Sequence, residues 1–353
     1  MNDGGVEPPP TSGYSLVPAK SVDDDTLIRF AAAVWADRPP HDRILSSWWR
    51  RAESSCAVAA IHNPTGIMAG LCGGRPSQWM IGGQAHPAIA ISDWYVAPGH
   101  TGKLIGKRLV RHFDAPDRFM YAFSISDDAI AYLRALGWVG PHSSYFMALP
   151  IPSLARMLHL AIARPSELEL RERVVTGGTL PADLGGELDQ IEARRTSALA
   201  HMRRDAAEWR WRLPICAERT YRFCVAYREG APVGYVVLRR LTPGRIRQLG
   251  RIEGGFIADL AAEDAAAVCA LAVRAVAIAA DMRASLVLAA TTIPVHQRVL
   301  ARLGFLSPAV PLIGKMLARR APQFMWVPRG PAAALVASDI AFTFADATID
   351  FDL

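Results

Sequence analysis

The sequence has few of the features that would place the chain outside a reducing compartment or within a membrane. Its five cysteines form no CxxC pair, and an odd number argues against a disulfide framework or a zinc site. Met1 to Thr11 lack the basic and apolar regions of a secretory signal. No apolar run reaches the roughly 18 residues that span a bilayer. We therefore expect a cytoplasmic protein with no membrane span and no metal site.

Clustered positive charge is also missing. The chain has 39 Lys and Arg against 33 Asp and Glu, a formal net charge of +6. This balance favours an anionic ligand such as a nucleotide. Because the arginines are scattered along the chain, we expect no nucleic-acid groove. The sequence does not indicate an oligomeric state.

What the sequence does contain is an internal repeat. At 353 residues the chain is long enough for two ordinary domains, and three local patterns recur at offsets of 164, 166 and 167 positions. They are a strand–turn–strand with paired glycines, a strand that ends in an aspartate, and a helix that closes on glycine plus an aromatic residue. In order along the two copies, the marker residues are Gly66 and Gly70, Asp93 and Gly137, then Gly230 and Gly234, Asp259 and Gly304. Because the patterns are unrelated but the offsets nearly constant, duplication explains them better than coincidence.

The order of elements within each copy predicts an α/β layered fold with mixed sheets. We expect a flexible tail over residues 1–20, a first domain over 21–150, a linking helix over 151–165 and a second domain over 166–353. Terminal strands at 144–149 and at 323–327 with 341–352 are expected to close the first and the second domain, respectively.

A loop that follows a strand in the first copy carries the clearest chemical signal. The strand ends at Val96, and Gly102, Lys103, Gly106 and Lys107 come before or at the start of a helix. N–H groups at a helix N-terminus bind anions, and glycines let a phosphate approach the backbone. A plain glycine-rich β–α turn is the alternative interpretation.

These residues resemble the acetyl-CoA motif of the GNAT acetyltransferases, in which Val-x-Pro precedes a glycine loop and a helix. The positions that fit are Val96, Pro98, Gly102, Lys103, Ile105, Gly106 and Leu109. The resemblance implies acetyl-CoA, or another acyl-CoA, as co-substrate, bound by Tyr95, Val96, Ala97, Gly102, Lys103, Leu104, Ile105, Gly106 and Lys107. Two residues depart from the pattern: Thr101 replaces Gln or Arg, and Leu104 replaces the first glycine of the loop.

The second copy lacks the loop. Leu260–Ala265 contains no glycine, and Glu263 and Asp264 would repel a pyrophosphate, so this copy is not expected to bind CoA. Trp209–Pro214, the following hairpin and Phe344–Asp352 more weakly resemble tandem GNAT proteins of bacterial surface-polysaccharide synthesis.

The family resemblance also implies the chemistry. A backbone N–H between Tyr95 and Ala97 would hold the thioester carbonyl, a carboxylate or water would act as base, and a tyrosine would protonate the thiolate. Asp93 is the candidate base, with a structural acid as the equal alternative. The usual tyrosine position holds Leu133, so the neighbouring Tyr132 is the candidate acid, with packing as its other interpretation. Ser126 stands where the family often has Asn.

The resulting function is transfer of an acetyl or other acyl group from CoA to an amine or hydroxyl of a small-molecule or carbohydrate acceptor. A different class is a GNAT-fold binding or scaffold protein that has lost catalysis, which Thr101, Leu104 and Leu133 favour. A third is an aminoacyl transferase similar to the FemAB proteins, for which no specific motif is present.

Overall fold

The computed structural model describes residues 13–37, 39–52, 56–123, 125–143, 145–150, 167–195, 199–241, 253–306 and 323–343. The chain divides into two compact units, and each of them is made of two separate segments of the sequence. The first comprises Met1–Arg75 with Ile91–Ala115, and the second comprises Pro76–Ala90 with Pro116–Leu353. Two long strands, β3 (Ile67–Ile81) and β4 (Gln84–Val96), contribute residues to both units.

In the first unit the strands follow the order β1-β2-β3-β4, and β2 pairs antiparallel with both β1 and β3. The elements besides β3 and β4 are β1 (Tyr14–Pro18), α1 (Asp24–Val34), α2 (Trp48–Arg51), β2 (Ala57–His62) and α3 (Ile105–His112). Residues 14–18 were expected in a flexible tail, which is wrong for this segment. Its apolar side chains Leu16 and Val17 lie opposite Ala60 and Ala59 of β2.

Local sequence explains how the helices of the first unit begin and pack. Asp23 caps α1 by accepting a hydrogen bond from the Thr26 N–H at 2.8 Å. Helix α3 packs closely on β3 because Gly70 has no side chain: a Cβ there would lie 2.9 Å from Leu109 and 3.2 Å from Ile105. The paired-glycine spacing that recurs in the two copies thus has a packing reason at Gly70 in the first copy.

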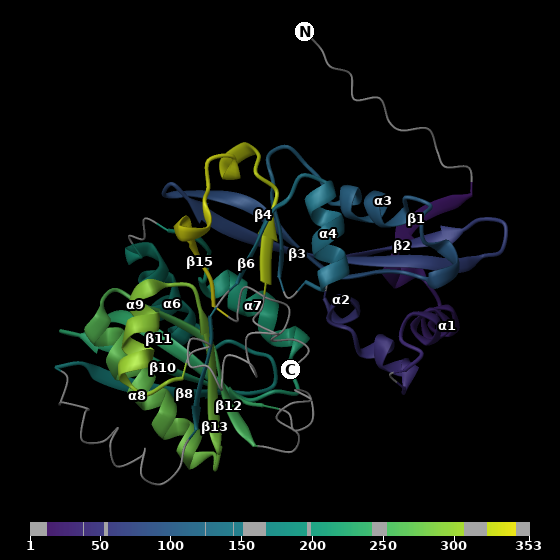
Figure 1. Ribbon diagram of the computed structural model, residues 1–353. Coiled ribbons are helices and arrows are strands. Elements are labelled where there is room, and N and C mark those ends of the chain that lie inside the picture. The colour runs from purple at the N-terminus through teal and green to yellow at the C-terminus, as the bar shows by residue number, and fades with distance from the viewer. Residues whose placement is uncertain are drawn as a thin grey trace. The chain divides into compact units, whose positions relative to one another are not determined.

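The second unit contains a six-stranded sheet in the order β7-β13-β12-β11-β10-β8. Its strands are β7 (Tyr145–Pro150), β8 (Glu169–Val175), β10 (Tyr221–Arg228), β11 (Ala231–Arg240), β12 (Gly254–Ala262) and β13 (Leu286–Thr291). The apolar helix α8 (Ala265–Asp281) lies along this sheet (Figure 1) and buries Leu271, Ala275 and Ala279 in its core. The parallel pairing of β12 with β13 covers Gly254 to Phe256, whereas the antiparallel pairing of β12 with β11 runs from Gly255 to Ala262.

The same unit holds the remaining strands of the other sheet. Strand β4 is followed in order by β5 (Phe119–Phe123), β14 (Gln323–Trp326) and β6 (Val139–Ser143). Two short strands, β9 (Ala200–Met202) and β15 (Ile340–Ala341), pair with each other, and β9 also pairs with β3. The helices of this unit besides α8 are α4 (Asp127–Ala135), α6 (Ala182–Arg194), α7 (Ala206–Ile215) and α9 (Pro294–Arg302).

Hydrogen bonds at equivalent positions confirm two mixed-sheet repeats. The N–H of Ala97 donates to the Ala69 carbonyl at 2.9 Å, and the N–H of Glu263 donates to the Val233 carbonyl at 3.0 Å. The two donor residues are 166 positions apart and the two acceptor residues are 164 positions apart, which are offsets also seen in the sequence. The helix ends also match: Trp138 donates to Leu133 and Phe305 donates to Leu300, around glycines at φ 85° and 87°. Asp93 and Asp259 therefore lie on equivalent strands.

The terminal strands are exchanged relative to the sequence-based expectation. Strand β7 was expected to close the first domain but pairs antiparallel with β13, in the sheet of the second copy. Strand β14 was expected to close the second domain but lies between β5 and β6, in the sheet of the first copy. The expectation was wrong because the choice of neighbouring strand is a tertiary property that a short apolar segment does not encode.

Several sequence-based predictions lie outside the described residues. The linking helix at 151–165 and most of the segment 341–352 belong to this group, so the domain boundary between 150 and 166 stays a prediction. None of the helices among the described residues is long and apolar enough to cross a membrane. The described residues also contain no group of three His, Cys, Asp or Glu side chains that could hold a metal ion.

Candidate active site

Asp93 interrupts β4 with a left-handed backbone conformation. Its φ is 47°, a region that Asp tolerates better than most residues and that bends a strand locally. The indole N–H of Trp48 in α2 donates to Asp93 Oδ2 at 2.8 Å. Burial raises the pKa of Asp93 to about 6, and the Trp48 hydrogen bond opposes part of that rise. The carboxyl group therefore changes protonation close to neutral pH, as a general base requires.

The backbone N–H groups of the strand beyond Asp93 point to different edges. The N–H of Ala97 donates to Ala69 in β3 and is therefore occupied. Successive N–H groups of a strand point to opposite edges, so the N–H of Val96 points away from β3. Of the three residues predicted to hold a thioester carbonyl, the Val96 N–H points in a suitable direction and the Ala97 N–H does not.

A tight loop connects this strand to α3. Pro98–His100 form one 3₁₀ turn, the Thr101 hydroxyl donates to the Pro98 carbonyl at 3.0 Å, and Gly102 adopts a φ of 75°. Leu104 precedes α3 with a φ of 58°, a conformation natural to the glycine that the family pattern has here. The loop thus keeps the backbone path of a glycine although the residue is Leu, and its side chain is 59% exposed.

The N-terminus of α3 is electropositive and has no side-chain cap. No acidic residue lies in its first turn, and Leu104 makes no capping hydrogen bond. The first N–H groups of a helix have no partner within it, and the helix dipole adds partial positive charge. Lys103 and Lys107 stand on either side of this point in the sequence. The arrangement can bind a phosphate or pyrophosphate.

Two of the predicted cofactor residues have structural reasons of their own. Ile105 is 2% exposed and packs on β3 at Gly70. A Cβ on Gly106 would lie 3.2 Å from the Trp94 ring, and the Trp94 indole donates to the Gly106 carbonyl at 3.2 Å. Their side-chain positions face the protein, so only their N–H groups can reach a ligand.

Tyr132, the predicted acid, lies on α4 in the second unit, whereas Asp93 and the loop belong to the first. Its side chain is partly buried. Leu133, at the usual tyrosine position, is 1% exposed and belongs to the core. Ser126, which replaces the common Asn, caps α4 by accepting from the Ala129 N–H at 3.4 Å.

In the second copy a carboxylate occupies the helix N-terminus. Two positions separate Glu263 from Ala265, where α8 begins, whereas eight separate the equivalent Ala97 from Ile105. Asp264 caps α8 through the Ala267 N–H at 2.8 Å and pairs with Arg228 at 2.6 Å. The anion that a phosphate would supply is thus already provided by the chain.

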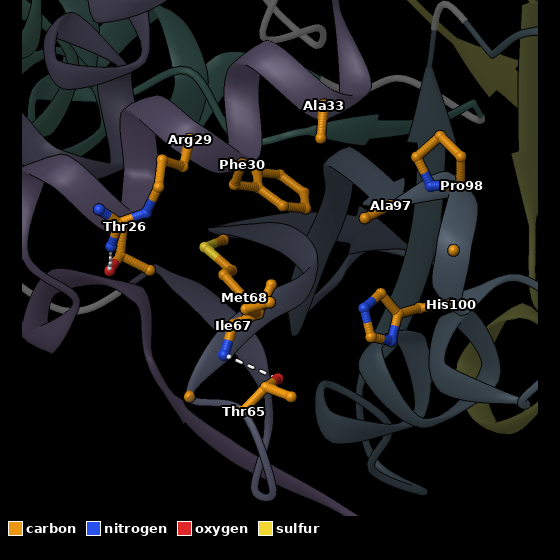
Figure 2. Close-up of a pocket in the computed structure, with 12 residues that line it drawn as sticks. Thr26, Arg29, Phe30, Ala33, Thr65, Ile67, Met68, Ala97, Pro98 and His100 are labelled. Atoms are coloured by element: carbon orange, nitrogen blue, oxygen red, sulfur yellow. Dashed lines mark hydrogen bonds between the residues drawn. The ribbon is translucent and has the colours of Figure 1, made fainter.

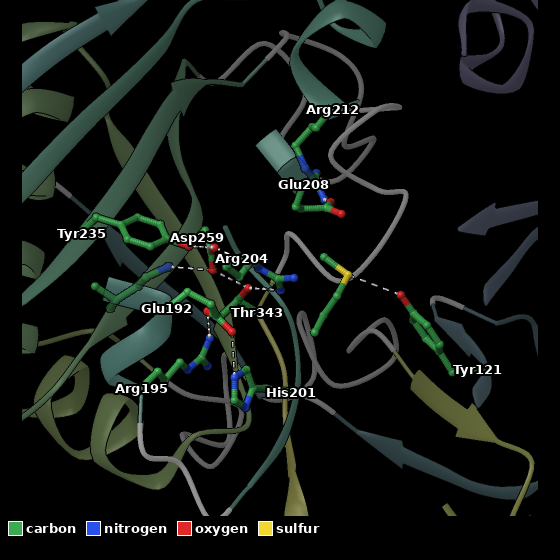
Figure 3. A network of polar contacts seen from close by, with 12 residues as sticks. Tyr121, Glu192, Arg195, His201, Arg204, Glu208, Arg212, Tyr235, Asp259 and Thr343 are labelled. Atoms are coloured by element: carbon green, nitrogen blue, oxygen red, sulfur yellow. Dashed lines mark hydrogen bonds and ion pairs between the residues drawn. The ribbon is translucent and has the colours of Figure 1, made fainter. Parts of the chain in front are cut away.

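The aspartate of the second copy is neutralised by a buried network (Figure 3). Asp259, 1% exposed, accepts from Arg204 at 3.0 Å, from Tyr235 at 2.6 Å and from Thr343 at 2.7 Å. Burial alone would raise its pKa, but Arg204 and the two hydroxyl groups together hold the pKa below the usual value. Unlike Asp93, this carboxylate is a fixed charge and not a base poised near neutral pH.

Some residues of these sites carried no signal in the sequence. Trp48, Arg204 and Thr343 were not singled out for the contacts that they make with the two aspartates. Each lies more than 40 positions from its aspartate in the chain. A periodic pattern or local motif could not have revealed them, because the contact depends on the tertiary fold.

Comparison with known proteins agrees with this geometry. Residues 23–138 match the model of the Acetyltransferase (GNAT) family. The matched region contains Asp93 and the whole loop up to α3, so the likeness to this family includes both parts of the candidate site. A search of curated proteins found no match.

Solved structures share the fold across both copies. A GCN5-related N-acetyltransferase from Anabaena variabilis is 16% identical, with a TM-score of 0.58 over 89% of this chain and 72% of that one. A tandem GNAT protein from the clavulanic acid biosynthesis pathway is 16% identical, with a TM-score of 0.52 over 89% and 97%. Saccharomyces cerevisiae N-myristoyltransferase with bound myristoyl-CoA is 11% identical, with a TM-score of 0.52 over 90% and 83%. The chain has the tandem GNAT fold of N-acyltransferases.

These comparisons do not support the weaker resemblance to proteins of surface-polysaccharide synthesis. That resemblance rested on the aromatic stretch at Trp209 and on residues 344–352. Trp209 is fully buried against Tyr221 and Phe223, so it has a core-packing role, and 344–352 lie outside the described residues.

Proposed function

We propose that the chain is an acyltransferase that moves an acetyl or other acyl group from CoA to an amine or hydroxyl of a small-molecule or carbohydrate acceptor. The observation that carries the proposal is the uncapped N-terminus of α3, entered through a loop that keeps its glycine-like path at Leu104. The pyrophosphate would lie on the N–H groups from Gly102 to Lys107, with Lys103 and Lys107 supplying positive charge.

The reacting end of the cofactor would lie along the edge of β4 that faces away from β3. The Val96 N–H has the direction to donate to the thioester carbonyl, and this bond strengthens as negative charge develops on that oxygen. Asp93 would accept the proton of the attacking amine or hydroxyl, directly or through a water molecule. Tyr132 remains the proposed proton donor to the departing thiolate.

The Asp93 environment suits this role. A carboxylate with a pKa of about 6 is ionised at pH 7 yet more basic than an exposed aspartate. Trp48 fixes one carboxylate oxygen by donating to it at 2.8 Å, which leaves the other oxygen to face the proton of the acceptor. The scaffold alternative predicts the same fold with no turnover, so a turnover assay separates the two.

Lys103→Glu is expected to abolish most of the thermal stabilisation that acetyl-CoA gives the wild-type chain. The substitution places a carboxylate where the pyrophosphate would bind, and a ligand raises the unfolding temperature only as far as it binds the native state. The measurement is a thermal-shift titration with acetyl-CoA, with release of free CoA thiol recorded in parallel for glucosamine, tyramine and spermidine.

Arg111→Glu is the matched control, because it reverses the same charge at the other end of α3, in its last turn. It should leave the acetyl-CoA shift intact. Equal shifts in the wild type and Lys103→Glu would contradict the proposed cofactor site. A normal shift without thiol release for any acceptor would favour the binding-protein alternative.

A further inference from the structure

A cavity of about 690 Å³ lies beside α1 in the first unit and adjoins the proposed cofactor loop, with Ala97 shared between the two (Figure 2). Its wall combines residues from α1, from the β2–β3 turn and from the segment between β4 and α3. This size lies within the range of small-molecule sites. The N–H of Ala97 is already bonded to Ala69, and Val96, whose N–H would hold the thioester carbonyl, does not line the cavity.

The floor of the cavity is apolar. Phe30 of α1, Met68 of β3 and Ala97 line it and are 3%, 2% and 5% exposed. Ile67, at the start of β3, also lines the cavity but is 55% exposed, which is unusual for a large apolar side chain. A ligand with an apolar body would cover this surface and gain the corresponding hydrophobic free energy.

The polar groups on the wall are Arg29 and His100, which can donate, and the Thr26 and Thr65 hydroxyl groups, which can donate or accept. Figure 2 shows Arg29 on one side of the cavity and His100 on the other. Among the described residues the guanidinium of Arg29 makes no ion pair; it donates to the Thr26 hydroxyl at 2.8 Å, and the pKa of Asp23 is lowered by hydrogen bonds from Thr26 and also by the Arg29 charge. No carboxylate lines the cavity. The Arg29 guanidinium therefore has most of its five N–H donors available.

His100 is a neutral ring at the cavity wall, and one of its tautomers can donate to a ligand. The Tyr14 hydroxyl lies 2.8 Å from His100 Nδ1. Burial, with Lys103 and His62 nearby, lowers the pKa of His100, so the ring is neutral at pH 7.5. With the hydroxyl donating to Nδ1, the single ring proton resides on Nε2, which is then a hydrogen-bond donor.

We propose that this cavity binds a second small molecule, a carboxylate with an apolar body, separately from acyl-CoA. The carboxylate pairs with Arg29, the body lies on Phe30 and Met68, and an oxygen acceptor at the far end of the ligand meets His100. A cationic ligand is disfavoured because the wall offers it Arg29 and no acid.

The test uses three probes of one shape: 4-phenylbutyrate, 4-phenylbutanol and 4-phenylbutylamine. Isothermal titration calorimetry on the full-length chain at pH 7.5 should show the carboxylate binding at least tenfold more tightly than the alcohol, and no binding of the amine. Arg29→Gln should weaken the carboxylate about ten- to hundredfold, because a charge-assisted hydrogen bond is lost, and leave the alcohol unchanged.

Two variants of the cavity wall distinguish binding at this site from binding at the cofactor site. Ala33→Trp, at an exposed position on the cavity wall, should block all three probes by filling the space. Ala33→Trp and Arg29→Gln should both leave the acetyl-CoA thermal shift intact, so the failure of either proposal is distinguishable. Equal affinity for the three probes, an unchanged affinity in Arg29→Gln, or no binding at millimolar concentration would each overturn the inference.

Discussion

Asp93→Asn is expected to lower kcat/KM for acyl transfer by about 10²- to 10⁴-fold, the usual contribution of a positioned general base. In the wild type, kcat/KM should rise with pH through about 6, where Asp93 becomes ionised, and then level off. The variant should lack this acidic limb. Initial rates between pH 5 and 8, with the best acceptor of the panel, measure both effects.

The same substitution should not destabilise the fold above pH 6. Burial raises the folded-state pKa of Asp93 from 3.8 to about 6, so folding favours the protonated carboxyl group. The stability that this group contributes is complete below 3.8 and is lost as the pH rises through about 6. A neutral Asn avoids that loss, so activity falls while the unfolding temperature stays equal or rises. Wild-type activity in Asp93→Asn would eliminate this residue as the base.

Asp259→Asn, at the equivalent position of the second copy, is expected to lower the free energy of unfolding by about 3 to 5 kcal/mol. Its carboxylate is fully buried and paired with Arg204, and removal of one partner of a buried ion pair leaves an uncompensated charge. Urea denaturation followed by tryptophan fluorescence measures the change.

The pH dependence of Asp259→Asn has the opposite sign to that of Asp93→Asn. The pKa of Asp259 is lowered below 3.8, so its stabilisation is present above that pH and lost as the pH falls. The difference between wild type and variant should therefore narrow below about pH 4.

Asp264→Asn serves as the control for Asp259→Asn. Asn still caps α8, and only an exposed ion pair with Arg228 is lost, so the cost should stay under about 1 kcal/mol. A change of less than 1 kcal/mol in the free energy of unfolding of Asp259→Asn would show that the buried network around Asp259 does not stabilise the second repeat.

Much of this architecture could be predicted from the sequence because the repeat preserves local patterns. Gly137 and Gly304 end their helices at nearly the same positive φ, and a glycine after a helical pattern signals such an end. Asp93 and Asp259 follow buried strand residues at a constant offset, so their equivalence could be read directly. The loop could be located because glycines and lysines cluster there.

The strand exchange could not be predicted, because the sequence of β7 or β14 fits either sheet. Strand β14 places Phe324 and Trp326 in a cluster with Trp79 and Tyr121, and these partners come from distant parts of the chain. Composition also misled at the N-terminus, where acidic and proline-rich residues continue into a segment that forms β1.

The different protonation behaviour of Asp93 and Asp259 likewise depends on residues that are distant in the sequence. The sequence around Asp93 and Asp259 is similar, yet an indole hydrogen bond serves one and a guanidinium ion pair the other. Only tertiary structure brings Trp48 or Arg204 to the carboxylate, so a sequence motif predicts the position and not the protonation behaviour.

The most direct test of the account is the stoichiometry of acetyl-CoA binding by the full-length chain. The first copy has an open helix N-terminus and the second has its own capping carboxylate, so calorimetric titration should give one site per chain. The same titration of Lys103→Glu should lose that site, and Asp264→Asn should retain it without adding another. Two sites per chain, no site, or a single site that survives unchanged in Lys103→Glu would contradict the assignment of the cofactor to the first copy.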